Sequence, residues 1–508
     1  MQTQRVRLYW DTVRHLKPIQ VWRRVWRPLP RVRGVQASRR EPQERWVDSV
    51  QREDAWLGGR RWKLLNQERE ISTWNDPGIE KLWLYHLHYL ERPHPETVTA
   101  WIEENPAGNG NGWEPYPISR RITSWVKWLL ESPLEETLRR QVENSLAAQA
   151  EWLSQSLEWH LLGNHLLANA KGLVLAGAYF DGPDAWRWLQ EGIGILRREL
   201  KEQILEDGGH FELSPMYHAL LLEDLLDLVN ISHLFPQALG EEETEWRRLA
   251  ARMLGWLSQM THPNGQTAYF NDSVHGMAAD HVELESYAAR LGVKAEHVPL
   301  GPSGYIRLEA GDTVVLFDAG PVGPDYQPGH AHCDLLSLEV SYNGQPVITN
   351  TGISTYESCP TRLEERRTAA HNTVRVDGAE QSEVWESFRV ARRARVLHTK
   401  VSRCWAEAKH DGYRRLTGGV THWRRVEVDN EQLKVDDRLE GTGFHRVEIF
   451  WHLAPGANVN VQFGDNIVRL DKTGAWCIEF GRRIERPVVV GLWEGYLPVQ
   501  LETCLFFN

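Results

Sequence analysis

The chain has 508 residues, of which 25% are charged and 41% hydrophobic, a balance typical of globular proteins but too long for a single hydrophobic core. Five scattered cysteines with no C-x-x-C pair argue against a disulfide framework. The net charge of −11 hides a basic start, because residues 1–40 carry a balance of +10 and leave −21 for the rest.

The first 70 residues are expected to form a basic arm and a lead-in segment. Eleven Lys or Arg and one acid, Asp11, lie in residues 1–40, interleaved with Trp22 and Trp26. One interpretation is a solvated or partly disordered arm, and the other is contact with an anionic polymer or a membrane surface. No nucleic-acid-binding motif is present, so no nucleic-acid partner is expected.

Targeting signals are not visible in this sequence. No apolar run reaches about 18 residues, so no transmembrane helix is expected. The charged N-terminus lacks the apolar segment of a signal peptide. The sequence therefore predicts a cytoplasmic location.

Residues 71–298 are expected to form a helical domain, because apolar side chains recur at helical spacing between short Gly, Pro or Asn turns. The predicted helices span residues 118–130, 134–159, 165–180, 185–205, 215–234, 244–260 and 279–291. Seven or more antiparallel helices with short connections indicate a bundle, solenoid or toroid.

Two polar clusters interrupt these helices. Asn164 and His165 open an apolar helix, where they are either a helix cap and a core histidine or functional groups. Tyr217 follows a Ser-Pro helix start and is either a core aromatic or a proton carrier. Glu212 and Asp207 lie by a Gly-Gly turn, where loop roles are favoured over acid catalysis.

From residue 299 to 508 the apolar period changes from 3.6 to 2, which predicts strands. They are expected at residues 305–308, 313–318, 336–342, 373–376, 423–428, 432–438, 446–452, 467–470 and 476–480. Turn signals such as Asn343-Gly344 separate them, as in an antiparallel sandwich. The predicted fold is therefore α+β and multidomain, with the boundary between residues 291 and 303.

The most informative stretch is Gly329-His330-Ala331-His332-Cys333-Asp334, just before an expected strand. Two histidines at i and i+2 on extended backbone point the same way. Imidazoles and a carboxylate placed this closely are costly unless they are paired, metal-bound or catalytic. His332 with His371 and a group near Asn350 would suit Zn²⁺.

Taken in order, these clusters resemble the heparinase II/III-like polysaccharide lyases over roughly residues 75–455. The matching motifs are Gly112-Trp113-Glu114-Pro115-Tyr116-Pro117, Gly163-Asn164-His165-Leu166, Phe211-Glu212-Leu213-Ser214-Pro215-Met216-Tyr217-His218, Gly329-His330-Ala331-His332, Ala370-His371-Asn372-Thr373-Val374 and Ser382-Glu383-Val384-Trp385. The family implies an N-terminal (α/α) toroid, a C-terminal antiparallel β-sandwich, and β-elimination at a uronic acid.

The resemblance also implies a role for each matched residue. Asn164 and His165 would neutralise the substrate carboxylate, and Tyr217 and His330 would move protons. Substrate contacts are expected from Trp113, Glu212 and Tyr356. The partner would be an anionic uronate polysaccharide, in a setting such as bacterial exopolysaccharide metabolism. No cofactor is required for this chemistry.

Two departures from the family pattern stand out. Some members bind a metal, for which His332, Asn350 and His371 would be the ligands here, with Zn²⁺ in a structural role. The usual third ligand is an Asp, whereas Asn350 is neutral and a poorer ligand. Family members are also commonly exported, so the periplasm or cell envelope is the alternative location.

Two other functions stay open at the level of sequence. A glycoside hydrolase on a similar helical toroid would need a pair of carboxylates, with Glu212 as the first. A non-catalytic polysaccharide-binding protein would use the abundant Trp side chains, 24 in all, for stacking. The sequence does not specify the polymer, the C5 epimer, endo or exo action, sulfate tolerance or oligomeric state.

Overall fold

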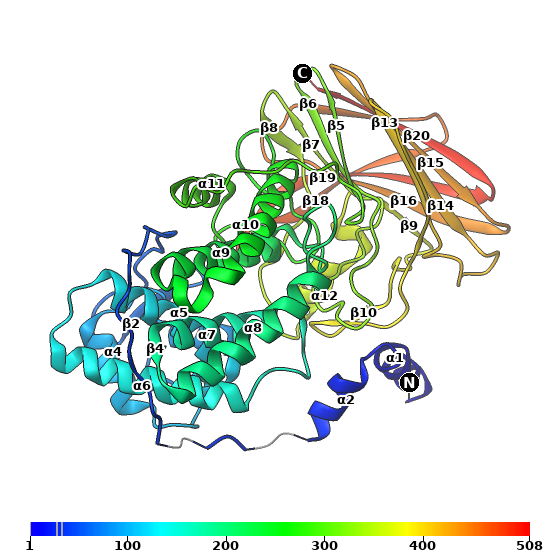
Figure 1. The fold of residues 1–508 in the computed structure, drawn as a ribbon. Coiled ribbons are helices and arrows are strands. Elements are labelled where there is room, and N and C mark those ends of the chain that lie inside the picture. The colour runs from blue at the N-terminus through cyan, green and yellow to red at the C-terminus, as the bar shows by residue number, and fades with distance from the viewer. Residues whose placement is uncertain (1, 27–28, 32–33, 508) are drawn as a thin grey trace.

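A computed structural model describes residues 2–26, 29–31 and 34–507 of the chain. Helices and antiparallel strands segregate into a helical half and a strand half that lie side by side (Figure 1). The chain is therefore α+β, as the change in apolar period predicts. Among the described residues, no helix is both long and apolar enough to cross a bilayer.

The helical half is built from nine described α-helices. They are α3 (Lys81–Tyr89), α4 (Pro95–Glu104), α5 (Pro115–Glu131), α6 (Glu136–Gln155), α7 (Gly163–Tyr179), α8 (Pro183–Gln203), α9 (Pro215–Leu234), α10 (Pro236–Gln259) and α11 (His281–Arg290). All seven predicted helices are confirmed, although α10 begins earlier than predicted. Five of the nine start with proline, which suits the first helical turn because it has no N–H to leave unpaired.

The strand half contains three larger antiparallel sheets. The first has the order β5 (Tyr305–Ala310), β6 (Thr313–Asp318), β7 (Leu338–Tyr342), β8 (Gln345–Ile348). The second has the order β12 (Val396–Val401), β13 (Trp405–His410), β14 (Thr421–Val428), β15 (Gln432–Glu440), β20 (Val499–Phe507), β17 (Val459–Phe463). The third has the order β18 (Val468–Glu479), β19 (Arg482–Tyr496), β16 (Phe444–His452), β9 (Val374–Val376). Side chains from all three sheets share one hydrophobic core.

Two sequence predictions about strands are wrong. The two strands predicted at residues 467–470 and 476–480 are instead one continuous strand, β18 (Val468–Glu479), because the long strand β19 pairs with it across Gly474. Strand β7 begins at Leu338 rather than at residue 336, because Leu336 adopts a positive φ of 56°, whereas the segment from His330 to Asp334 precedes the strand as expected. Strands β8, β12, β13, β17, β19 and β20 were not predicted from the sequence.

The described part of the basic arm contacts both halves of the molecule while many of its side chains stay exposed. Helix α1 (Gln2–Val13) contacts the strand half, where Arg7 pairs with Glu383 at 2.6 Å. Helix α2 (Pro18–Val25) carries Gln20, whose buried amide donates to the carbonyls of Leu161 and Tyr326, both at 3.3 Å. The arm thus bridges the two halves. Many of its side chains still face solvent, among them Trp22 at 59% and Trp26 at 61% exposed, so the described arm is docked through a few contacts and remains solvated elsewhere.

Shorter elements complete the described chain. They are the pairs β1 (Ser38–Arg39) with β4 (Phe180–Asp181), β2 (Arg61–Leu64) with β3 (Gln67–Glu70) and β10 (Val384–Trp385) with β11 (Arg389–Val390), the helix α12 (Pro360–Arg366), and the 3₁₀ turns η1 (Asn111–Trp113) and η2 (Thr368–Ala370). Buried polar contacts join the halves, among them Tyr305 Oη to the Leu213 carbonyl at 2.6 Å. Asp207 accepts from the Ser303 hydroxyl at 2.6 Å and therefore has a structural loop role.

Candidate active site

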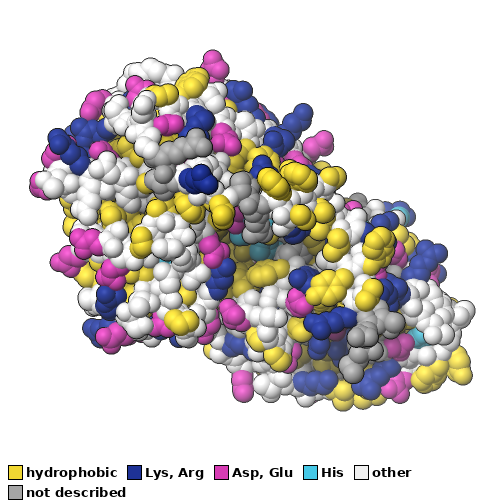
Figure 2. Space-filling view, turned by 90° about the horizontal axis from the view of Figure 1, so that it is seen from below, with side chains coloured by type: hydrophobic (Ala, Val, Ile, Leu, Met, Phe, Trp, Pro, Cys, Tyr) yellow, Lys and Arg dark blue, Asp and Glu magenta, His cyan; other side chains and the backbone are white. Residues whose placement is uncertain are grey.

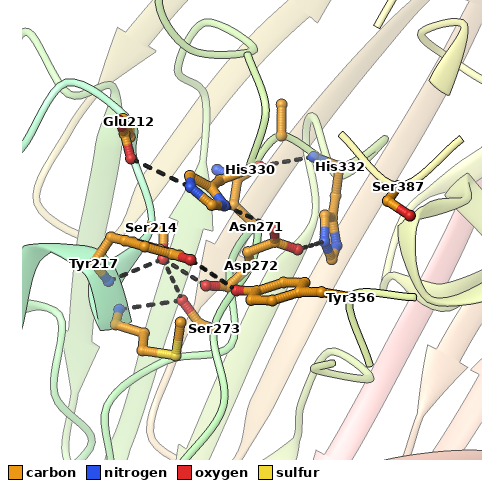
Figure 3. A network of polar contacts seen from close by, with 12 residues as sticks. Glu212, Ser214, Tyr217, Asn271, Asp272, Ser273, His330, His332, Tyr356 and Ser387 are labelled. Atoms are coloured by element: carbon orange, nitrogen blue, oxygen red, sulfur yellow. Dashed lines mark hydrogen bonds and ion pairs between the residues drawn. The ribbon is translucent and has the colours of Figure 1, made fainter. Parts of the chain in front are cut away.

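The polar clusters of the two halves meet at the junction between them. Figure 3 shows His330 and Tyr217 close together, with Asp272 between the two histidines and Tyr356 beside the phenol. Seen from below, the molecule is hollowed near its middle, with hydrophobic and histidine side chains visible inside the hollow (Figure 2). Residues separated by more than 160 positions in the sequence thus form one group.

His330 is oriented by a buried carboxylate. Its Nδ1 lies 2.9 Å from Asp272 Oδ2, so that nitrogen carries the proton and donates it to the carboxylate. The opposite nitrogen, Nε2, lies 3.3 Å from the Asn164 amide nitrogen and 3.7 Å from Glu212 Oε2. With Nδ1 protonated, Nε2 carries the lone pair, which accepts from the Asn164 amide in the free protein.

Tyr217 stacks on His330, with ring centroids 3.8 Å apart and planes 29° from parallel. The phenol sits in the first turn of α9, where the Ser214 hydroxyl accepts from its backbone N–H. Its Oη lies 3.1 Å from Tyr356 Oη. Burial, then the neighbouring Tyr356 and Asp272, raise the pKa of Tyr217 well above its ordinary value. The phenol is therefore protonated at neutral pH.

Asn164 is held by Glu212. The carboxylate accepts from the Asn164 side chain at 2.9 Å and from its backbone N–H at 3.2 Å. This approach requires Gly163, whose φ is +56° and whose Cβ, if present, would lie 2.5 Å from the same carboxylate. Glu212 is buried and committed to these bonds, which disfavours its role as the acid of a hydrolase and places it beneath the site.

His165 is the candidate for a positively charged side chain that could neutralise a substrate carboxylate. Its Nδ1 lies 3.1 Å from Glu158 Oε1, its ring packs against Tyr116, and 29% of the side chain is exposed. Burial disfavours its charged form, but the Coulombic attraction and hydrogen bond of Glu158 outweigh burial, and Glu212 adds to them, so the pKa of His165 is raised. The charge is therefore retained to higher pH than in a free histidine.

Asp272 is the central residue that the sequence analysis missed. It accepts from His330, from His332 Nε2 at 2.8 Å and from Arg362 at 2.7 Å. Burial would raise the pKa of this carboxyl, but Arg362 and the two histidines hold it well below its ordinary value. The signal available in the sequence was an acid in a loop, Asn271-Asp272-Ser273, without a recognisable spacing to its partners. Asp334, the carboxylate next to the two histidines in the sequence, instead accepts from the Asn271 backbone N–H at 2.8 Å.

The three metal-ligand candidates lie together but make an incomplete donor set. The His332 and His371 rings are 5.2 Å apart, and His332 Nδ1 and both His371 nitrogens are buried without hydrogen-bond partners, as a metal site would leave them. The third donor does not fit, because Asn350 Oδ1 accepts from Ser337 Oγ at 2.7 Å. Within the described ranges, no group of three His, Cys, Asp or Glu side chains could hold a metal ion.

The predicted substrate-binding residues divide into two groups. Tyr356 lies in the site, with its ring 5.2 Å from Phe388 and its hydroxyl facing Tyr217. Trp113 lies elsewhere, buried among Trp101 and Trp152, with its N–H donating to the Asn105 carbonyl at 3.0 Å. Because no ring face of Trp113 is free for stacking on a sugar, its assignment as a substrate contact is corrected to a core residue.

Comparison with known families agrees with this arrangement. The family model described as heparinase II/III N-terminus matches residues 88–291, and the model described as heparinase II/III-like, C-terminal matches residues 293–498. Together the two models cover both the helical half and most of the strand half.

Individual proteins give the same result. A heparin-sulfate lyase of Pedobacter heparinus is 30% identical over 232 residues, covering 42% of this chain and 33% of that protein. One of Bacteroides stercoris is 23% identical, covering 82% of this chain and 68% of that protein. The crystal structure of a heparinase III superposes with a TM-score of 0.65 at 18% identity, over 81% of this chain and 72% of the other. At that identity the likeness concerns the fold.

Proposed function

Because this chain belongs to the heparinase II/III family, we propose that it is a polysaccharide lyase that cleaves a uronic-acid-containing polysaccharide by β-elimination. The observation that carries the proposal is the stacked pair of Tyr217 and His330, with Asp272 behind the imidazole. The protonated phenol of Tyr217 and the imidazole of His330 then face the same part of a bound substrate. Elimination needs such a pair, whereas sugar stacking alone does not.

The substrate carboxylate is the first requirement. The proton on C5 of a uronate is weakly acidic, and neutralising the adjacent carboxylate lowers the free energy of the enolate-like intermediate. His165 supplies a positive charge at the start of α7, and the neighbouring Asn164 supplies an amide N–H once the substrate carboxylate replaces its contact with His330. The role of Asn164 is supported by its position 3.3 Å from His330 Nε2, and that of His165 by its place next to Asn164 at the start of α7.

Proton transfer completes the reaction. His330 accepts the C5 proton at Nε2, and Asp272 stabilises the resulting imidazolium. The electron pair of the C–H bond forms the C4–C5 double bond, and the C4–O4 bond breaks. Tyr217, protonated in the free protein, donates its proton to O4. The product carries a 4,5-unsaturated uronate at its new end.

We also infer the finer architecture from the likeness to solved heparinases. The helical half is an incomplete (α/α) toroid, and the strand half is a β-sandwich. No step of the proposed reaction uses a metal, since His332 acts through Asp272 and the third donor position is taken by Asn350.

Activity on defined polymers tests the proposal. The protein is incubated with heparan sulfate, the substrate class named for its relatives, and with chondroitin, hyaluronan, alginate, glucuronan and bacterial exopolysaccharides. The ultraviolet absorbance of the conjugated uronate is expected to rise with at least one polymer. Binding without any rise in absorbance across the panel would refute elimination on these substrates.

A further inference from the structure

A cavity of about 700 Å³ lies away from the proposed catalytic residues, none of which lines it. Its wall is formed by residues 14–15 just after α1, by residues 300–306 at the start of β5, and by parts of residues 319–325 and 393–401. Small-ligand sites have volumes of about 300–1,000 Å³, so this one is large enough for one or two sugar rings. Helix α1 lies beneath the strand half (Figure 1).

The lining of this cavity is cationic. It contains Arg14, His15, Arg393 and Arg395, against one described acid, Asp325. The Arg393 side chain is 8% exposed and that of Asp325 72% exposed, with 3.2 Å between the Arg393 guanidinium and the Asp325 carboxylate. Arg393 Nε is buried and has no hydrogen-bond partner among the described atoms. The cation therefore faces inward, while the acid that pairs with it faces solvent.

The pKa of His15, which lines the same cavity, responds to these arginines. The pKa of His15 is lowered first by burial and then by Arg393, with Arg14 and Arg395 adding to the effect and Asp325 opposing it. The guanidinium of Arg395 has no ion pair within the described chain, and that of Arg14 lies 3.6 Å from Asp11. Of the three arginines that line the cavity, Arg395 is thus the one whose charge has no carboxylate partner among the described residues.

Apolar side chains complete the wall. Ile306, Val322 and Val396 line the same cavity as the arginines. Arginine forks bind carboxylates and sulfates, and the C–H faces of a sugar ring pack on aliphatic side chains. We propose that this cavity is a second glycan-binding site that takes an acidic sugar unit, carboxylated or sulfated. The choice of a glycan rests on the proposed function.

The cavity and the catalytic residues are connected through one loop. Residues 319–325 of its wall run on through Tyr326 to His330. Tyr326 is fixed by a hydrogen bond to Glu202 at 2.9 Å and by Lys17, whose ammonium lies 3.9 Å from the ring centroid. A long polyanion can thus be held at a second point while another of its units is cleaved.

Binding stoichiometry tests this proposal separately from catalysis. Calorimetry is carried out with a heparan sulfate tetrasaccharide on the Tyr217→Phe protein, in which turnover is expected to be slow enough for binding to be measured. Arg14→Ala with Arg395→Ala is then added, and Arg438→Ala, an exposed strand arginine outside the cavity, serves as the matched control. We expect two equivalents bound before the double change and one after it, with affinity at the cavity reduced about tenfold or more.

The other possible results of the calorimetry distinguish the cavity site from the catalytic site. One equivalent falling to none would support the cavity site and count against substrate binding at Tyr217 and His330. Unchanged stoichiometry and affinity in the double variant would overturn the cavity site. Inorganic sulfate binding as tightly as the tetrasaccharide would overturn its assignment to a sugar. If the double variant fails to fold, the His15 ring signals in the unmutated chain decide, because they must shift on addition of tetrasaccharide and not of neutral dextran oligosaccharide.

Discussion

The division of labour between Tyr217 and His330 follows from their surroundings. A buried phenol beside a second phenol stays protonated, so Tyr217 suits proton donation. An imidazole with a carboxylate at Nδ1 keeps Nε2 as the basic nitrogen, so His330 suits proton abstraction. The same stacked pair therefore presents an acid and a base to one substrate.

Replacing Tyr217 by Phe is expected to lower kcat by about 10²–10⁴-fold while changing KM little, since only the proton donor is removed. Steady-state kinetics on the polymer found active measures both constants. Tyr356→Phe is the matched control, because it removes the neighbouring hydroxyl and leaves the donor in place. An equal loss in both variants would contradict the assignment of the acid to Tyr217.

Glu158→Gln should move the alkaline loss of activity to lower pH. Glu158 raises the pKa of His165, so the imidazolium persists as pH rises until that pKa is passed. Without the carboxylate the charge is lost earlier. The pH profile of kcat/KM shows this shift, and NMR titration of the His165 ring confirms its origin. A profile identical to that of the unchanged protein would remove His165 from the role of neutralising charge.

Among the site residues, those in short motifs were predictable and those in bare loops were not. Asn164, Tyr217 and His330 stand beside Gly, Pro or a second His, and these neighbours give each position a local signal. Asp272 and Arg362 pair across 90 positions with no local pattern, so only the folded chain shows them. Trp113 lies in a motif shared with the family and was therefore expected to contact substrate, but in the structure it packs against Trp152 in the helical core.

At the level of elements, helix α12 and the loop that carries Asp272 form one unit. Arg362 of α12 is fully buried and pairs with Asp272, and Arg366 of the same helix donates to the Ala331 carbonyl at 2.9 Å, between the two histidines. The helix thus fixes both the carboxylate and the backbone of the histidine loop. Its seven residues act through these bonds rather than through apolar packing.

Arg362→Met is expected to reduce the free energy of unfolding by about 3–5 kcal/mol, because it leaves a buried carboxylate without its cation. Urea denaturation followed by circular dichroism measures the loss. Arg438→Met, an exposed residue on β15, is the control and should change stability by less than about 0.5 kcal/mol. Equal effects of the two substitutions would mean that the Asp272 pair does not hold the site.

Asn350→Asp is expected to create a metal site. A carboxylate would join His332 and His371, whose buried nitrogens lack partners, and complete a three-ligand set. Added Zn²⁺ should then raise the Tm of this variant and leave that of the unchanged protein where it is. Asn350→Asp with His371→Ala is the control. A zinc-dependent rise in the unchanged protein would show that Asn350 does not prevent binding.

At the scale of the whole molecule, the two halves are predictable and their junction is not. The spacing of apolar residues changes from a period of 3.6 to a period of 2, and this change predicts helices followed by strands. The junction depends on contacts such as Tyr305 with Leu213, and on an arm whose Gln20 bonds to both halves. Such contacts join distant segments and leave no periodic trace in the sequence.

The most direct test of elimination is the mass balance of the products. Polymer cleaved in H₂¹⁸O is analysed by mass spectrometry, and the product masses are compared with that of the intact chain. Elimination adds no water, so we expect fragments that sum to the substrate mass and carry no ¹⁸O. Fragments heavier by one water, with ¹⁸O at the new reducing end, would show hydrolysis and contradict the account.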